Sequence, residues 1–384
     1  ISVSKEASNS KAFSSYFSTL AHDDLVQSMA KPEWVVAAGS YPAYSEPNIG
    51  IVVFETDPQS GAVSWTRHLG AIGSDLRAKA IIRNEKQQIY YLMGEYDYVE
   101  NDQGFREMYL CALDKAGTPR WERHYRDPIN EANFQSSDLI YHPEKNIITI
   151  TSKLSKAGKM LGASVTHINP NDGDIINTFR ISEIDGNPDI RINDAIDARE
   201  RTVLVGELNE EPTRSFLLVF EPGKVPTSVL SKIYAADNKF NLRISGVRQH
   251  AEGLLYASFD YQRSSSQPNP GLLELKNTGD LTASYIYQVP DYEESIGLLT
   301  TYDQKGLVIK GTTGFAKDNA LLSLVGVNSP LKDDEKICSK RIDVLVSSGA
   351  KVEKYELKAL ELDASFETEM VVNKGKAEVR PCRQ

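Results

Sequence analysis

The side chains of this chain that could do chemistry fall into three groups: histidines, an oxygen-rich stretch and a set of tyrosines. The six histidines show no metalloprotease or zinc-ligand spacing. His68 and His124 occupy equivalent places in Trp65-Thr66-Arg67-His68 and Trp121-Glu122-Arg123-His124, which indicates a repeat rather than a metal site. A Gly-x-Ser-x-Gly elbow, a phosphate-binding loop and a dinucleotide fingerprint are also missing from the sequence. The pattern therefore predicts no catalytic residue.

The oxygen-rich stretch could bind calcium. Asp185, Asn187, Asp189 and Asn193 place side-chain oxygens at positions 1, 3, 5 and 9 of a calcium-type loop. The stretch departs from that pattern, because Pro188 stands at position 4 and the glycine of position 6 and the glutamate of position 12 are missing. Two interpretations stay open: a calcium site made by these four residues, or a solvated loop between strands. No other cofactor is predicted.

Five tyrosines give the strongest signal for binding. Tyr41, Tyr44, Tyr96, Tyr98 and Tyr261 all follow apolar strands, so we expect them to emerge on one rim of the fold. A tyrosine ring stacks while its hydroxyl hydrogen-bonds, which suits a carbohydrate or a protein surface. The alternative is that these tyrosines simply cap exposed strand ends.

The elements that must position these side chains follow a repeat. Six short apolar strands end at a glycine or a serine, at steps of 52 to 58 residues. The six end residues are Gly39, Gly94, Ser152, Gly206, Ser258 and Gly311. A period of this size indicates one supersecondary unit copied along the chain, and each unit reads as four β-strands. Such units stack radially, so we predict an all-β fold of the β-propeller type.

A second motif closes each unit. In the second unit the third strand ends at Asp114, Gly117 follows in the turn, and Trp121 begins the fourth strand. Asp bonds its own turn backbone, Gly supplies a positive φ, and the Trp is expected to lie against the next blade. This pattern resembles the β-propeller repeats of bacterial secreted and cell-surface proteins, over about residues 20–330. The resemblance implies a propeller fold outside the cytoplasm, and it transfers no catalytic residue.

The number of blades depends on the C-terminal region, residues 331–384. Residues 342–346 and 355–363 read as strands of a seventh, shortened blade, which residues 1–20 would complete. Six blades plus a charged C-terminal extension is the alternative. In both cases residues 1–384 are predicted to form a single propeller domain, because no linker rich in Gly, Ser or Pro divides the chain.

The three cysteines indicate the cellular compartment in which the protein works. Cys111 lies in an apolar third strand and is predicted to be a buried free thiol. Cys338 and Cys382 bracket the terminal unit, and we predict a disulfide between them, which requires an oxidising compartment; two free thiols are the alternative. The chain begins at Ile1 without a basic and apolar leader, as a processed product would. These features favour a secreted, cell-surface or periplasmic protein.

The net charge and the hydropathy of the chain limit the classes of partner that it can bind. The net charge of −10 argues against nucleic-acid binding, and no apolar run reaches the roughly 18 residues of a membrane span. The leading prediction is a non-enzymatic extracellular propeller that acts as a binding, adhesion or assembly module for protein or carbohydrate at a surface. The alternatives are a carbohydrate-active hydrolase or lyase, a quinoprotein-like enzyme, or a structural subunit that self-associates into an extracellular filament or coat.

Overall fold

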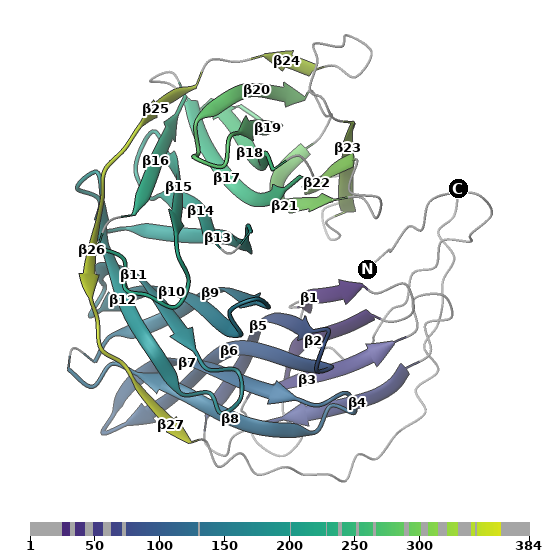
Figure 1. Ribbon diagram of the computed structural model, residues 1–384, viewed down its shortest axis with the longest axis vertical. Coiled ribbons are helices and arrows are strands. Elements are labelled where there is room, and N and C mark those ends of the chain that lie inside the picture. Colours follow the sequence, from purple (N-terminus) through teal and green to yellow (C-terminus); the bar gives the residue numbers. More distant parts are fainter. Residues whose placement is uncertain are drawn as a thin grey trace. The chain divides into compact units, whose positions relative to one another are not determined.

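The computed structural model describes residues 25–30, 35–42, 49–56, 63–70, 74–129, 131–199, 201–227, 229–236, 240–250, 253–263, 266–287, 292–300, 306–313, 321–328, 339–341 and 344–361. Every regular element in these ranges is a β-strand (Figure 1). Within them no helix has the length and apolar character needed to cross a membrane.

The strands neighbour one another in sequence order and build six sheets, which we number along the chain. Their bounds are, for sheet 1, β1 (Leu25–Ala30), β2 (Val35–Pro42), β3 (Ile49–Thr56) and β4 (Val63–Leu69); for sheet 2, β5 (Asp75–Asn84), β6 (Ile89–Glu100), β7 (Gln103–Leu113) and β8 (Pro119–Arg126); for sheet 3, β9 (Asn133–His142), β10 (Ile147–Lys156), β11 (Lys159–Ile168) and β12 (Ile175–Ile184); for sheet 4, β13 (Ile190–Asp197), β14 (Thr202–Leu208), β15 (Arg214–Phe220) and β16 (Leu230–Ala235); for sheet 5, β17 (Phe240–Gln249), β18 (Leu255–Arg263), β19 (Asn269–Leu275) and β20 (Leu281–Tyr287); and for sheet 6, β21 (Tyr292–Thr300), β22 (Gly306–Thr313) and β23 (Leu321–Asn328). This confirms the predicted all-β fold, whose repeated four-stranded unit is the blade of a β-propeller.

The glycines that mark the repeat are explained by a bulge in the first strand of the unit. In sheet 2 the register of β5 against β6 shifts at Lys79, and Gly94 pairs with β5 beside this bulge. A β-carbon on Gly94 would collide with the carbonyl oxygen of Arg77, and one on Gly206 in sheet 4 would collide with that of Arg191. Because the bulge brings two backbones this close, only glycine fits at these two positions.

The turn glycines connect one sheet to the next. Gly117 has a φ of +75°, and a β-carbon there would lie 2.6 Å from the ring of Trp65 in β4. Gly173 has a φ of +80° and stands in the same relation to Trp121 of β8, at 2.8 Å. The Trp121 indole Nε1 also donates to the carbonyl of Pro170, at 3.1 Å. The prediction that the outer-strand tryptophan lies against the turn of the next blade is therefore confirmed for these two sheets.

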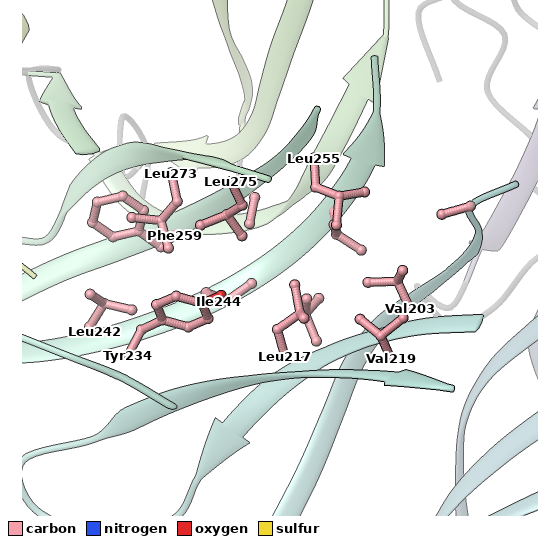
Figure 2. Packing of buried hydrophobic residues seen from close by; sticks show 14 of the residues in the cluster. Val203, Leu217, Val219, Tyr234, Leu242, Ile244, Leu255, Phe259, Leu273 and Leu275 are labelled. Atoms are coloured by element: carbon pink, nitrogen blue, oxygen red, sulfur yellow. The ribbon is translucent and has the colours of Figure 1, made fainter. Parts of the chain in front are cut away.

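The chain divides into two compact units. Unit 1 contains residues 1–150, 168–176 and 356–384, and its core includes Ile51, Leu69, Leu92 and Cys111 from sheets 1 and 2. Unit 2 contains residues 151–167 and 177–355, and in its core side chains of sheet 4 meet side chains of sheet 5 (Figure 2). The labelled residues of that core are Val203, Leu217, Val219, Tyr234, Leu242, Ile244, Leu255, Phe259, Leu273 and Leu275. The single propeller domain over residues 1–384 stays a prediction.

The C-terminal region adds a fifth strand to four of the sheets. β24 (Ser339–Arg341) pairs with β20, β25 (Leu345–Ser347) with β16, β26 (Ala350–Lys354) with β12, and β27 (Lys358–Glu361) with β8, all antiparallel. These strands are the yellow segment of Figure 1. Along the chain they pair first with sheet 5, then with sheets 4, 3 and 2, which is the reverse of the order in which the sheets occur in the sequence. We call β24–β27 the C-terminal strap.

The strap differs from the predicted seventh blade over residues 331–384. Its strands pair with the outer edges of other sheets instead of with one another. The physical reason is that each fourth strand leaves a row of free N–H and C=O groups, which any short extended segment can satisfy. Residues 1–20 and the rest of 331–384 lie outside the described residues.

Candidate functional site

The longest hairpin of the described chain, β6–β7, carries two of the predicted binding tyrosines. Its pairing continues as far as Glu100 opposite Gln103. Asn101 and Asp102, between them, have φ of 52° and 62°, as a two-residue type I′ turn requires. Tyr96 and Tyr98 therefore lie inside the long strand β6, whereas the sequence predicted that they follow the strand.

An aromatic cluster covers one face of this hairpin. Tyr98 stacks with Tyr96 at a centroid distance of 5.2 Å and with Phe105 of β7 at 5.4 Å. The guanidinium of Arg126 in β8 lies 5.2 Å from the Tyr98 ring centroid, within reach of a cation–π contact. Tyr96 and Tyr98 share the face because side chains alternate along a strand, and Phe105 is the pairing partner of Tyr98.

A buried carboxylate holds this cluster in place. Glu107 is only 2% exposed and accepts hydrogen bonds from the Tyr98 hydroxyl at 2.5 Å and from Arg126 Nε at 2.6 Å. Its other oxygen bonds to Nδ1 of His124. Burial alone would raise the pKa of Glu107, but hydrogen bonds from His124, Tyr98 and Arg126 outweigh it, so the pKa lies below its usual value. Burial, followed by the bond to Glu107, raises the pKa of Tyr98. The Tyr98 hydroxyl is thus fixed as a donor to Glu107.

The opposite face of the hairpin carries a second set of paired charges. Arg106 donates to both oxygens of Asp97, at 2.7 and 3.0 Å. Glu95, 1% exposed, accepts from the backbone N–H of Ser136 at 3.0 Å and lies 3.7 Å from Lys79 Nζ. Burial raises the pKa of Glu95, and the charges of Lys79 and Arg106 oppose that rise. Of these interactions, the hydrogen bond from Ser136 to Glu95 joins sheet 2 to β9 of sheet 3.

Two exposed aliphatic side chains stand close in sequence to residues of the aromatic cluster. Val99, next to Tyr98, is 72% exposed, and Ile129, three residues after Arg126, is 70% exposed. Arg126 joins the two segments, because it hydrogen-bonds the Tyr98 hydroxyl and lies 3.7 Å from Glu100. We call Tyr98, Val99, Phe105, Arg126 and Ile129 the sheet 2 rim.

Of the other three predicted binding tyrosines, the structure describes the side chain of Tyr261. Tyr261 lies in β18 of unit 2, where its ring stacks on Phe240 at 4.6 Å and packs against the core. The side chain of Tyr41, in β2, and the whole of Tyr44 lie outside the described residues.

The four predicted calcium ligands have protein partners. Asp189 is bound by Lys153 Nζ at 2.5 Å and by the Asn209 amide at 2.8 Å, and Asp185 pairs with Arg214 at 2.6 Å. Burial would raise the pKa of Asp189, but the hydrogen bonds from Lys153 and Asn209 lower it further than burial raises it.

The two asparagines serve the backbone. Asn187 accepts from the N–H of Asp189 at 2.8 Å, and the amide of Asn193 donates to the carbonyl of Ile244 at 2.6 Å. Among the described residues no group of three or more His, Cys, Asp or Glu is placed to hold a metal ion. Asn193 lies within β13, and the calcium site stays a prediction.

The cysteines are described only in part. Cys111 is a free thiol with 0% exposure, which confirms that prediction. Cys338 and Cys382 lie outside the described residues, and their disulfide stays a prediction.

Sequence reasoning missed Val99, Phe105, Arg126 and Ile129 as rim residues. A signal for Phe105 was present, because the Asn101-Asp102 dipeptide predicts a two-residue hairpin turn that places residue 105 opposite residue 98. The other three residues carry no local signal, since only the pairing of β8 with β7 brings Arg126 to Tyr98.

No family model matches this chain, and no curated protein matches it. Solved structures similar to it include the polysaccharide lyase Uly1, at 9% identity over 85% of this chain and 94% of that chain, with a TM-score of 0.40. The phage phi92 endosialidase matches at 12% identity over 85% of this chain and 58% of that chain, with a TM-score of 0.41. The β-propeller domain of the Trilobed protease from Pyrococcus furiosus matches at 9% identity over 83% and 94%, with a TM-score of 0.40. At these identities no activity transfers to this chain.

Proposed function

We propose that this protein is a non-enzymatic binding module that recognises a partner protein through the sheet 2 rim. One observation carries the proposal: Val99 and Ile129 are 72% and 70% exposed, and each stands within three residues of a side chain, Tyr98 or Arg126, whose geometry is already fixed. Single exposed aliphatic residues are ordinary on protein surfaces. Aromatic and arginine side chains held rigid beside them are the usual anchors of protein interfaces, because little side-chain entropy is lost on binding.

The hydrogen bonds of the rim favour a protein partner over a carbohydrate. A sugar is held by free hydroxyl or amide groups around an open aromatic ring. Here the Tyr98 hydroxyl is committed to Glu107, and the Tyr96 hydroxyl accepts from Ser74 Oγ at 3.1 Å. The aliphatic side chains beside them offer contact area and no hydrogen bond. We further propose that the module acts outside the cytoplasm, in adhesion or assembly, because the predicted Cys338–Cys382 disulfide requires an oxidising compartment.

The test is a binding screen with matched variants. The intact protein is applied to an array of surface proteins and an array of glycans, and the affinity for each hit is then measured for Val99→Asp and Ile129→Asp. A charge in the centre of an apolar contact should weaken protein binding by at least about tenfold. Ile176→Asp is the control, because Ile176 is also exposed, at 46%, but lies in sheet 3.

Two outcomes contradict the proposal. One is binding of glycans alone, with no protein hit. The other is a protein hit whose affinity falls equally in the rim variants and in Ile176→Asp.

A further inference from the structure

Sheet 2 contains a buried carboxylate that takes no part in the hydrogen bonds described above. Glu122 of β8 is 7% exposed, and it pairs in register with Cys111 of β7. Cys111 and Tyr109, both 0% exposed, are members of the apolar cluster that joins sheet 2 to sheet 1 within unit 1. Glu122 thus projects from the edge of a hydrophobic interface between two sheets.

Neither oxygen of this carboxylate has a hydrogen-bond partner. Both Oε1 and Oε2 of Glu122 are shielded from solvent and unpaired, and so is the hydroxyl of Tyr109. An ionised carboxylate in such a place loses its hydration and gains nothing in return, so the neutral form is favoured. Burial accordingly raises the pKa of Glu122 to about 7, and the nearby Tyr109 hydroxyl opposes the rise without making a hydrogen bond of normal geometry.

The charged neighbours on this face are engaged elsewhere. On sheet 2, Glu107 and His124 bond to each other, and Arg126 bonds to Glu107. On sheet 1, Glu55 accepts from the Tyr90 hydroxyl at 2.8 Å and from Trp65 Nε1 at 3.2 Å. Arg67, whose side-chain Cγ would lie 3.0 Å from a β-carbon on Gly117, donates to the carbonyl of Thr66, and the backbone of Lys358 in β27 pairs with Arg126, four residues from Glu122 along β8. None of these groups compensates a charge on Glu122.

The repeat shows that this position does not need a carboxylate. In the equivalent tetrapeptide of β4, Trp65-Thr66-Arg67-His68, the place of Glu122 is taken by Thr66. A neutral side chain therefore suits the same point of the neighbouring unit.

We propose that Glu122 is a pH-sensing group: in its neutral form it keeps sheet 2 closed against sheet 1, and its ionisation loosens that contact. The sign follows from the free-carboxyl value of 4.5 and the buried value of about 7. The stabilisation of the closed state is complete below pH 4.5 and is lost as the pH rises through 7. Opening also exposes the thiol of Cys111, which is otherwise fully buried.

The experiment measures alkylation of Cys111 by iodoacetamide between pH 5 and pH 9, read from the mass of the peptide that contains Cys111. The rate for the native protein is divided by the rate for Glu122→Gln at each pH, which removes the intrinsic pH dependence of thiol chemistry. We expect this ratio to rise on the order of 10- to 100-fold over the range. Glu122→Thr, which introduces the side chain that β4 carries at the equivalent position, should behave as Glu122→Gln does.

A ratio that stays constant across the range would overturn the proposal. If neither variant folds, hydrogen exchange of the native protein decides the question. The amides of β7, corrected for intrinsic rates, should lose protection mainly between pH 5 and pH 7, and little more above pH 7, relative to those of β14 in unit 2, whose residues are all buried. Equal pH dependence in β7 and β14 would reject the switch. This inference does not depend on the proposed binding function.

Discussion

At the scale of single residues, two buried glutamates of sheet 2 differ in their hydrogen bonding and in the direction of their pKa shifts. Glu107 has three hydrogen-bond donors and a pKa below its usual value, whereas Glu122 has none and a pKa of about 7. The two lie on the same face, one facing the rim and one facing the core shared with sheet 1. Burial is similar for both, so the difference comes from hydrogen bonding.

Glu107→Gln tests the role of Glu107 in fixing the rim. Glutamine keeps the shape but loses the charge that His124 and Arg126 bind, so we expect the free energy of unfolding to fall by about 1–3 kcal/mol at pH 7. The native pKa is depressed, so the stabilisation is present above pH 4.5 and is lost as the pH falls through the native value. Urea unfolding at pH 7 and pH 3 measures this. A difference between native and variant protein that is as large at pH 3 as at pH 7 would show that the charge is not the cause.

At the scale of elements, the repeat is explained by backbone sterics. The bulge in the first strand brings its carbonyl against the second strand, and the turn glycines bring one sheet against the tryptophan of another. Both contacts exclude a β-carbon at Gly94, at Gly206 and at the two turn glycines, whereas Ser152 and Ser258 take the equivalent strand position in sheets 3 and 5. The regular spacing of these glycines therefore marks the points where the backbone approaches a neighbouring strand or ring most closely.

Gly94→Ala should show this cost directly. The new methyl group would overlap the carbonyl oxygen of Arg77, so we expect a loss of about 1–3 kcal/mol or more in the free energy of unfolding. Gly104→Ala, in β7 of the same sheet, is the control, because no atom lies within 4 Å of its β-carbon position. Thermal or urea unfolding compares the two variants, and equal stability would refute the steric explanation.

At the scale of the whole molecule, the C-terminal strap links sheets that are far apart in the sequence. Its backbone pairs with four sheets, and a few side chains anchor it. Tyr355, 7% exposed, lies under the guanidinium of Arg180 at 5.8 Å, and Arg180 also pairs with Glu353 of β26. Other strap residues, such as Leu345 at 64% exposure, contribute mainly through the backbone.

Tyr355→Ala should release the strap locally. Removing a buried aromatic ring costs about 3 kcal/mol, and we expect the loss to appear first as faster hydrogen exchange in β26 and in its partner β12. Leu345→Ala should change stability by less than about 0.5 kcal/mol, because its side chain is exposed. Exchange that rises equally in all sheets, or not at all, would contradict the anchoring role of Tyr355.

Local chemistry along the chain was enough to predict the four-stranded unit, its turn glycines, the outer tryptophans and the buried thiol of Cys111. Each of these features depends on contacts of a residue with its own backbone or with the next strand. Short stretches of sequence are therefore enough to predict them. Only the tertiary structure decided that Glu107 collects His124, Arg126 and Tyr98 while Glu122 has no partner, because pairing between strands brings these residues together. The same holds for the strap: a free sheet edge accepts almost any extended segment, so which edge each short strand joins depends on the folded chain.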